Sequence, residues 1–131
     1  MSQMQVELVA ADRLVWSGEA NMVIARTTEG DVGILPNHAP MLSLMVDGIV
    51  DVTTTDGETW IAAVDAGFLS VANNRISILA EHAEMSHDID LEKARADLER
   101  AQSAGEDDDE ATAAAERAWA EARIRATERA S

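Results

Sequence analysis

The side chains best suited to chemistry in this sequence are Asp31, His38 and Ser43, which lie within one short stretch. An acid, an imidazole and a hydroxyl are the components of a nucleophilic triad. A serine nucleophile often stands on a sharp, glycine-lined turn, whereas Ser43 is followed by ordinary apolar residues. The pattern therefore argues against acyl transfer, and we predict that the chain has no catalytic residue of its own.

The same stretch is conformationally restricted. Pro36 and Pro40 fix their own φ angles and push the residues before them into extended conformations. We therefore predict a stiff surface loop from Gly30 to Pro40 that runs into an apolar segment at 41–46. A fixed shape without a nucleophile suits contact with another protein. The predicted interface comprises Asp31, His38, Pro40 and Met41.

Two further groups resemble metal sites only superficially. His82 and His87 are five residues apart, but a helical zinc pair needs a spacing of about four residues and a third converging ligand. The acidic run 107–110 lacks the alternating pattern and the distant glutamate of a calcium loop. We interpret the first group as part of a solvated linker that can serve as a hinge, and the second as the acidic start of a helix. No metal site is predicted.

Composition narrows the classes of partner. The 131 residues include 25 acidic ones against Lys93 and nine arginines, which gives a formal net charge of -15. This charge disfavours nucleic acid and anionic membrane surfaces as partners. The chain has no cysteine, no apolar run near the roughly 20 residues of a membrane span, and no signal-peptide pattern at its start. We expect a soluble cytoplasmic protein without direct membrane insertion.

Residues 4–80 are predicted to be β structure. Apolar and polar residues alternate from Gln3 to Ala10, as in a half-buried strand. Short strands are expected at 14–16 and 22–24, separated by Ser17-Gly18. Hairpin turns are expected at Asp47-Gly48, Asp56-Gly57 and Asn73-Asn74. Short strands with turns at roughly 8–12-residue intervals favour an antiparallel sandwich or barrel.

The rest of the chain is predicted to be helical. A polar connector is expected at 81–87, and Asp88 or Asp90 is expected to cap a first helix. Its apolar stripe comprises Leu91, Ala94, Leu98 and Ala101. A break at Gly105–Asp109 precedes a second helix, whose stripe comprises Ala111, Ala115, Ala118, Trp119, Ala122 and Ala126. Helices joined by so short a loop lie antiparallel. We therefore predict a β-sandwich at residues 1–84 and an antiparallel α-helical hairpin at residues 85–131.

The string G-D-V-G-I-L-P-N-H-A-P from Gly30 to Pro40 resembles the signature of the ε subunit of bacterial F-type ATP synthases. That family has an N-terminal β-sandwich followed by two C-terminal helices, which is the layout predicted above. The resemblance implies a non-catalytic central-stalk subunit that couples proton-driven rotation to ATP synthesis and restrains ATP hydrolysis. It implies contacts with the γ subunit, with the polar loops of the c-ring through Asp31 and His38, and with the α and β subunits through the helices. It also implies a place at the cytoplasmic face of the bacterial cell membrane.

The segment from Ile89 to Ala94 resembles the family's I/L-D-x-x-R-A motif, which in some ε subunits helps to hold ATP. Lys93 stands where the motif has arginine, and an ammonium lacks the planar fork that grips phosphate. The resemblance implies ATP as a regulatory ligand rather than a required cofactor, with contacts from Asp90, Lys93, Arg117 and Arg123. The alternative is a capped helix start with Lys93 in solvent, and we expect weak or absent ATP binding.

A free-standing β-sandwich that binds a peptide or a sugar is the alternative from another functional class. Such modules usually display exposed aromatic side chains around a groove, and this chain has three tryptophans, one phenylalanine and no tyrosine. We expect Trp16 and Trp60 to be core residues and Trp119 to hold the helical hairpin against the sandwich.

Overall fold

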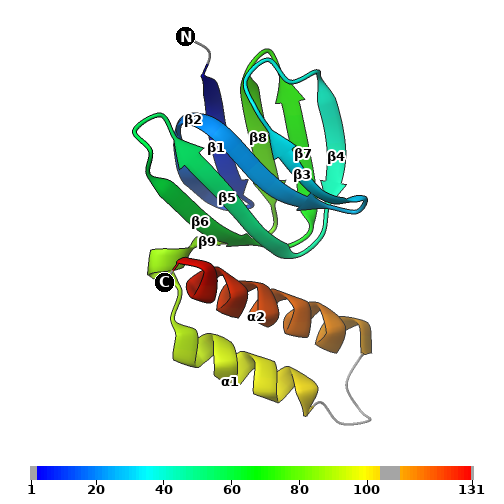
Figure 1. Cartoon of the computed structure of the whole chain (residues 1–131). Coiled ribbons are helices and arrows are strands. Elements are labelled where there is room, and N and C mark those ends of the chain that lie inside the picture. The colour runs from blue at the N-terminus through cyan, green and yellow to red at the C-terminus, as the bar shows by residue number, and fades with distance from the viewer. Residues whose placement is uncertain (1–2, 104–109, 131) are drawn as a thin grey trace.

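The computed structural model describes residues 3–103 and 110–130, in which a β part stands above a pair of stacked helices (Figure 1). The strands are β1 (Met4–Ala10), β2 (Arg13–Thr27), β3 (Gly30–Ile34), β4 (Met41–Met45), β5 (Gly48–Thr54), β6 (Thr59–Val64), β7 (Gly67–Ala72), β8 (Arg75–Ala80) and β9 (Ala83–Met85). A single 3-10 turn (Ser86–Asp88) leads to α1 (Leu91–Gln102) and α2 (Glu110–Ala130).

Strand pairing closes the β part around one core. The hydrogen-bonded order is β1-β8-β7-β4-β2-β5-β6-β9 with β3 beside β2. An additional β1–β2 pairing closes β1, β8, β7, β4 and β2 into a ring. The β1–β8 pair is parallel. The largest fully buried side chains are Met4, Ile34, Leu69, Ile76 and Ile78. The predicted fold class, a β-sandwich followed by an antiparallel helical hairpin, is confirmed.

The first two strands confirm one prediction and correct another. In β1 the apolar side chains of Met4, Val6, Leu8 and Ala10 are buried in alternation, as predicted. The predicted break at Ser17-Gly18 is wrong, because β2 runs through it without interruption. A Cβ added at Gly18 would lie 2.9 Å from the Trp16 indole, so this glycine makes room for a neighbouring side chain instead of ending the strand.

Two of the three predicted hairpin turns are confirmed. Gly57 has a φ of 85°, and Asn73 and Asn74 have φ values of 52° and 60°, the left-handed conformation that these turns need. The hairpin at Asp47-Gly48 is wrong, because β4 pairs with β7 while β5 pairs with β2 and β6. The Asp47 carboxylate instead accepts a hydrogen bond from the Ala66 backbone N–H at 3.0 Å. It thereby joins two corners of the sandwich, an interaction that a local turn pattern cannot reveal.

The prediction of a polar connector at 81–87 is also wrong. Ala83 and Met85 are buried, and the strand that contains them pairs with β6. The predicted boundary between residues 84 and 85 therefore falls inside β9. Of the two cap candidates, Asp90 caps α1 by accepting the Lys93 backbone N–H at 3.1 Å.

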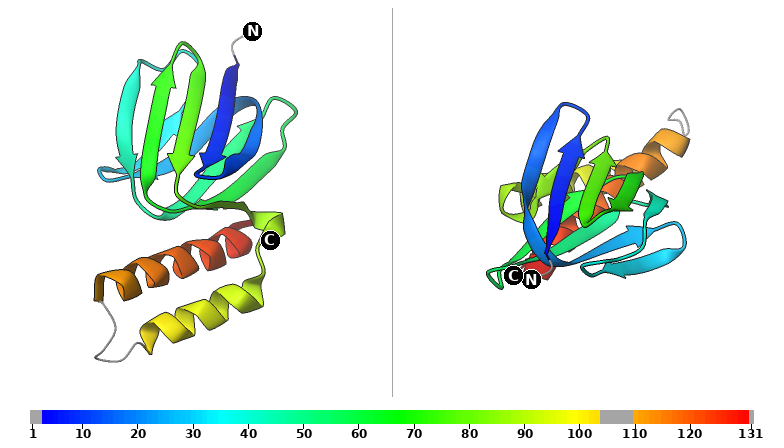
Figure 2. Two further views of the ribbon diagram at one scale, coloured as in Figure 1. Left: turned by 180° about the vertical axis from the view of Figure 1, so that it is seen from behind. Right: turned by 90° about the horizontal axis from the view of Figure 1, so that it is seen from above.

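The helices pack in series on one end of the sandwich. Helix α2 lies against β5 and β6, and α1 packs on α2, as the left view in Figure 2 shows. Ala122, Ala126 and the partly buried Trp119 meet Ile61 and Ala63 of the sheet, which confirms the predicted role of Trp119. Ala111 and Ala115 are exposed, so the predicted stripe holds only in the C-terminal half of α2. The predicted break at 105–109 lies outside the described residues.

Helix α2 has a second buried face that the sequence reading missed. Ala120 is fully buried and lies about 200° round the helix from Ala122, at about 100° per residue. A helix placed between a sheet and another helix needs two apolar faces, and alanine supplies both without a conspicuous pattern. Among the described residues, neither helix is at once long enough and apolar enough to cross a membrane.

Candidate functional site

The segment predicted as one stiff loop is a strand followed by a turn. Residues 30–34 form β3, which pairs with β2, and only residues 35–40 form a loop. Asp31 stands near the start of β3, and His38 lies in the loop beyond its other end. The structure therefore does not group Asp31 with His38, Pro40 and Met41 as the sequence reading supposed.

The triad candidates do not assemble. The His38 Nδ1 lies 2.7 Å from the Ala39 carbonyl oxygen, which only accepts, so the proton of the neutral ring is placed on Nδ1. The Ser43 hydroxyl donates to the Leu44 carbonyl at 3.3 Å. Each side chain thus bonds to its own neighbour in the chain. No hydrogen bond or ion pair recorded among the described residues joins Asp31, His38 and Ser43, so the arrangement offers no activated nucleophile.

The 35–40 loop is bonded to a turn from a distant part of the chain. The Asn37 backbone N–H donates to the Asn74 Oδ1 at 2.6 Å, and the Asn74 side-chain NH2 donates to the Asn37 Oδ1 at 3.2 Å. The Asn74 carbonyl also accepts the Gln5 N–H at 2.8 Å. These bonds gather the start of β1, the β3–β4 loop and the β7–β8 turn at the end of the sandwich opposite the helices (Figure 1).

An exposed apolar patch covers the outer face of β4, β7 and β8. Leu44 pairs with Phe68 across one ladder, and Phe68 pairs with Leu79 across the next, so the three side chains form one row. Leu42, two residues from Leu44 on the same face, is 73% exposed. A contiguous row of large apolar side chains in solvent marks a surface that another molecule covers. We call Leu42, Leu44, Phe68 and Leu79 the apolar patch.

Sequence reasoning missed the apolar patch, although two signals were present. Residues 32–46 and 66–80 contain no aspartate or glutamate, in a chain that has 25 of them. In addition, the M-L-S-L-M sequence of β4 has large apolar side chains on both faces, with Met45 buried and Leu42 exposed. A strand that is apolar on both faces is expected to be buried on both faces. The core of the sandwich covers only one of them, so the other face needs a partner.

Asp31 belongs to a charged cleft between the sandwich and α2. Together with Arg26 and Asp51 of the sheet and Arg125 and Arg129 of α2, it lines a small cavity of about 160 Å³. Arg129 donates to Asp51 at 3.0 Å. The last turn of α2 is thus connected to the outer face of β5 by an ion pair.

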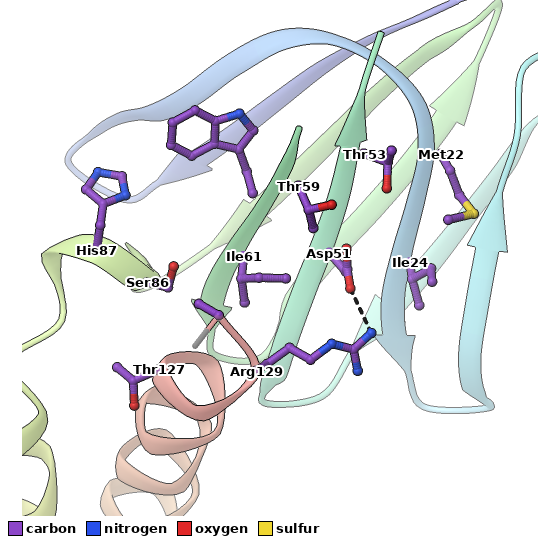
Figure 3. Close-up of a pocket in the computed structure, with 12 residues that line it drawn as sticks. Met22, Ile24, Asp51, Thr53, Thr59, Ile61, Ser86, His87, Thr127 and Arg129 are labelled. Carbon is purple, nitrogen blue, oxygen red and sulfur yellow. Dashed lines mark hydrogen bonds and ion pairs between the residues drawn. The ribbon is translucent and has the colours of Figure 1, made fainter. Parts of the chain in front are cut away.

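A larger open groove of about 820 Å³ lies beside this ion pair (Figure 3). The Arg129–Asp51 pair stands at one side of it, and His87 stands at another. The Trp60 ring, which also lines the groove, lies 5.7 Å from the His87 ring. The side chains of Met22, Ile24, Thr53, Thr59 and Ile61 form its sheet wall. The wall mixes methyl groups and hydroxyls, and the groove has no converging set of charged groups.

The four residues proposed to contact ATP are not equally available to a ligand. Asp90 is occupied as the helix cap, while Lys93 and Arg117 are exposed. Arg123 is 8% exposed at its side chain and donates to Asp97 of α1 at 2.7 Å, so an anion could reach it only by displacing that carboxylate. The Arg123 and Arg100 guanidinium groups hold the pKa of Asp97 below its ordinary value of 3.8, mainly through the Arg123 hydrogen bond. ATP binding here stays a prediction.

The two histidines proposed as a weak metal pair have different partners. The His82 Nδ1 lies 2.7 Å from the Asp65 carboxylate, and its ring lies 5.8 Å from Trp119. His87 is near Asp88 and the Trp60 ring. Within the described ranges no cluster of three metal-ligating side chains occurs.

Burial raises the pKa of Asp47. The hydrogen bond from the Ala66 N–H acts in the opposite direction, and the negative charge of Asp65 adds to the rise.

Known proteins are similar to this chain over nearly its whole length. The family model for "ATP synthase, Delta/Epsilon chain, beta-sandwich domain" matches residues 3–86. The ATP synthase epsilon chain of Rhodococcus jostii is 50% identical over 131 residues, 99% of this chain and 100% of the relative. That of Streptomyces avermitilis is 52% identical over 105 residues, 80% of this chain and 85% of the relative.

Solved structures give the same fold. A chain in the cryo-EM structure of the Euglena gracilis mitochondrial ATP synthase (OSCP/F1/c-ring) superposes with a TM-score of 0.73 at 25% identity, covering 98% of this chain and 79% of that one. A chain of the Tetrahymena thermophila mitochondrial ATP synthase central stalk and c-ring gives a TM-score of 0.62 at 19% identity, with 97% and 95% covered, a likeness of fold alone.

Proposed function

This chain belongs to the ATP synthase delta/epsilon chain family, and from that premise we propose how its surfaces are divided among the partners of the complex. The chain is an epsilon subunit of the ATP synthase central stalk and is not itself catalytic. It takes part in coupling rotation to ATP synthesis. The alternative of a free-standing module for a peptide or a sugar is not supported.

The observation that carries the proposal is the apolar patch. Its four large side chains lie on β4, β7 and β8, where Leu44 and Phe68 also line a groove with Arg125 of α2, and they need a partner that buries them. We assign this face to the γ subunit. Apolar area buried there stabilises the complex by about 25 cal/mol per Å², before the costs of association.

Substitution at the centre of the apolar patch tests this assignment. Phe68→Asp should abolish co-elution with γ, because a carboxylate would be buried without a partner. Leu35→Asp is the matched control, since Leu35 is also exposed, at 57%, but lies in the 35–40 loop, whereas Leu14 continues the row of the patch through Val9. Both variants should keep the wild-type melting temperature within a few degrees. Retention of γ by Phe68→Asp would refute the assignment.

The end of the sandwich opposite the helices is assigned to the c-ring. It presents the 35–40 loop, with His38 and the exposed Leu35, in a region without carboxylates. His38→Ala should leave the melting temperature unchanged and lower proton-driven ATP synthesis in assembled complexes. Asp31→Ala is tested separately, because Asp31 lines the cleft with Arg125 and Arg129. In this proposal the chain lies peripherally at the cytoplasmic face of the membrane.

The two helices are assigned to regulation, with α and β as their partners when they leave the sandwich. Residues up to 87 form the β unit in this proposal, and the helices form an arm that restrains ATP hydrolysis. Complexes with a chain truncated after His87 should hydrolyse ATP at least as fast as complexes with the full chain. An unfolded truncated chain would make the arm part of the core, and an unchanged hydrolysis rate would leave the arm without a regulatory role.

ATP is the remaining candidate ligand of the arm. Titration calorimetry of the isolated chain should show binding that is weak or absent, because Lys93 replaces an arginine and Arg123 is paired with Asp97. Micromolar affinity that is lost in Lys93→Ala would contradict this expectation.

A further inference from the structure

We propose that Asn74 is a positioning residue for the c-ring contact, an inference that rests on the proposed function of the 35–40 loop. Asn74 fixes the loop from the β7–β8 turn, which lies beside it because Met41 of β4 pairs with Val71 of β7. The surface offered to the partner is therefore composite, and comprises the 35–40 loop together with the β7–β8 turn.

The hydrogen bonds define this role. The amide of Asn74 makes both bonds to Asn37, accepting the backbone N–H at 2.6 Å and donating to the side-chain oxygen at 3.2 Å. Its backbone carbonyl accepts the Gln5 N–H at 2.8 Å. One residue thus ties together segments that are 37 and 69 positions away in the chain.

Backbone conformation explains why the loop needs this support. Asn37 has a φ of 69°, in the left-handed region that L-residues enter at an energetic cost. It stands directly between Pro36 and His38, within a turn closed by the His38 N–H on the Leu35 carbonyl at 3.2 Å. The Asn74 Oδ1 accepts the Asn37 N–H only when the peptide has this orientation, and so it favours the turn over extended alternatives.

The composition of the two segments supports a shared surface. Neither the 35–40 loop nor the 72–75 turn has a carboxylate, and Arg75 is their only arginine or lysine, in a chain of net charge -15. Two loops that lack the general acidity of the chain and are bonded to each other meet one partner together. Polar loops of a membrane rotor, which offer backbone carbonyls and side-chain oxygens, fit this surface of amide groups and Arg75.

Neighbouring asparagines supply a matched pair of variants. Asn73 and Asn74 both occupy left-handed positions of the same turn, with φ values of 52° and 60°, so glycine fits either site without strain. Of these two asparagines, Asn74 is the one whose side chain bonds to Asn37. Glycine itself should therefore cost little at either site, and a lower melting temperature of Asn74→Gly than of Asn73→Gly reports the loss of the Asn74 side-chain bonds.

The first measurement is amide hydrogen exchange in the full chain. The Asn37 amide should exchange roughly tenfold faster in Asn74→Gly, as expected for one lost hydrogen bond, and at the wild-type rate in Asn73→Gly. Asn74→Asp keeps the oxygen that accepts the Asn37 N–H but loses the NH2 that donates to the Asn37 Oδ1, so its exchange rate should lie between those of the wild type and Asn74→Gly. Equal exchange of the Asn37 amide in the two glycine variants would overturn the role of the side chain.

The second measurement is proton-driven ATP synthesis by complexes assembled with each variant. Asn74→Gly should lower the rate, while Asn73→Gly should not. If Asn74→Gly loosens the loop but synthesis is unchanged while His38→Ala lowers it, the positioning role is refuted and the c-ring assignment survives. If neither variant changes synthesis, the c-ring assignment itself fails.

Discussion

The sandwich and the helical arm are stabilised by different kinds of side chain. The sandwich core is built from Ile, Leu, Val and Met, many of them less than 2% exposed. The surface between α2 and the sheet relies on Ala122, Ala126 and the half-buried Trp119. Because apolar stabilisation scales with buried area at about 25 cal/mol per Å², an alanine contact contributes far less than a leucine contact. We therefore expect the sandwich to be a fixed body and the arm to be attached with a free energy that a partner can overcome.

The largest expected effect is a cavity in the sandwich. Ile78→Ala should lower the free energy of unfolding by about 3 kcal/mol, because Ile78 is fully buried in the β core. The melting temperature should fall, and the hydrogen-exchange protection of α2 should fall only through global unfolding. If Ile78→Ala lowered the hydrogen-exchange protection of α2 without unfolding the whole chain, the sandwich and the arm would not be independent regions.

Trp119→Ala should have the next largest effect, and it should be confined to the arm. The indole is the one large side chain that α2 contributes to the cluster with Ile61 and Ala63. Its removal should weaken docking by about 2 kcal/mol, below the cost for a fully buried tryptophan. Exchange of the α2 amides should accelerate while β7 and β8 stay protected. Equal acceleration in both regions would contradict the comparison.

Asp97→Ala should separate the two helices more than it affects the sandwich. It leaves the buried Arg123 without its carboxylate and should cost roughly 1.5 kcal/mol, since Asp97 itself is partly open to solvent. Arg100→Gln is the control, because Arg100 is bonded to the same carboxylate but is 72% exposed. The control should change the exchange of the α1 amides little.

Acid should loosen the contact between α1 and α2. The pKa of Asp97 is lowered in the folded chain, mainly by the Arg123 hydrogen bond. The ionised form therefore stabilises the fold above the ordinary pKa of 3.8, and this contribution is lost as the pH falls through the lower folded value. Burial raises the pKa of Asp47, which gives a contribution of opposite sign within the sandwich. Exchange of α1 amides between pH 5 and pH 2 should show the loss in the wild type and not in Asp97→Asn.

The smallest expected effect is at the Arg129–Asp51 pair. Arg129 is more than half exposed, so Arg129→Gln should weaken the docking of the last turn of α2 by about 0.5 kcal/mol or less. The effect should diminish as salt is added. A loss as large as that of Trp119→Ala would mean that the arm is held by charge instead of apolar contact.

The sequence predicted local features well and long-range ones poorly. The alternation in β1, the turns at Gly57 and Asn73-Asn74, and the cap at Asp90 all depend on residues close together in the chain. The wrong hairpin at Asp47-Gly48 depended on a partner at Ala66, and the missed strand β9 depended on β6. The apolar patch became visible only when the register placed Leu44, Phe68 and Leu79 side by side. Local patterns do not determine which strands become neighbours.

The short strand β9 sets how far the arm can reach. It has three residues, and its pairing with β6 is the last strand pairing before the helices. Peeling β9 from β6 would add roughly 10 Å of extended chain to the tether, at about 3.3 Å per residue. The same movement would expose Ala83 and Met85, both of which belong to the sandwich core. The tether can therefore lengthen only at the expense of the body to which it is fixed, and those two side chains set the limit of its extension.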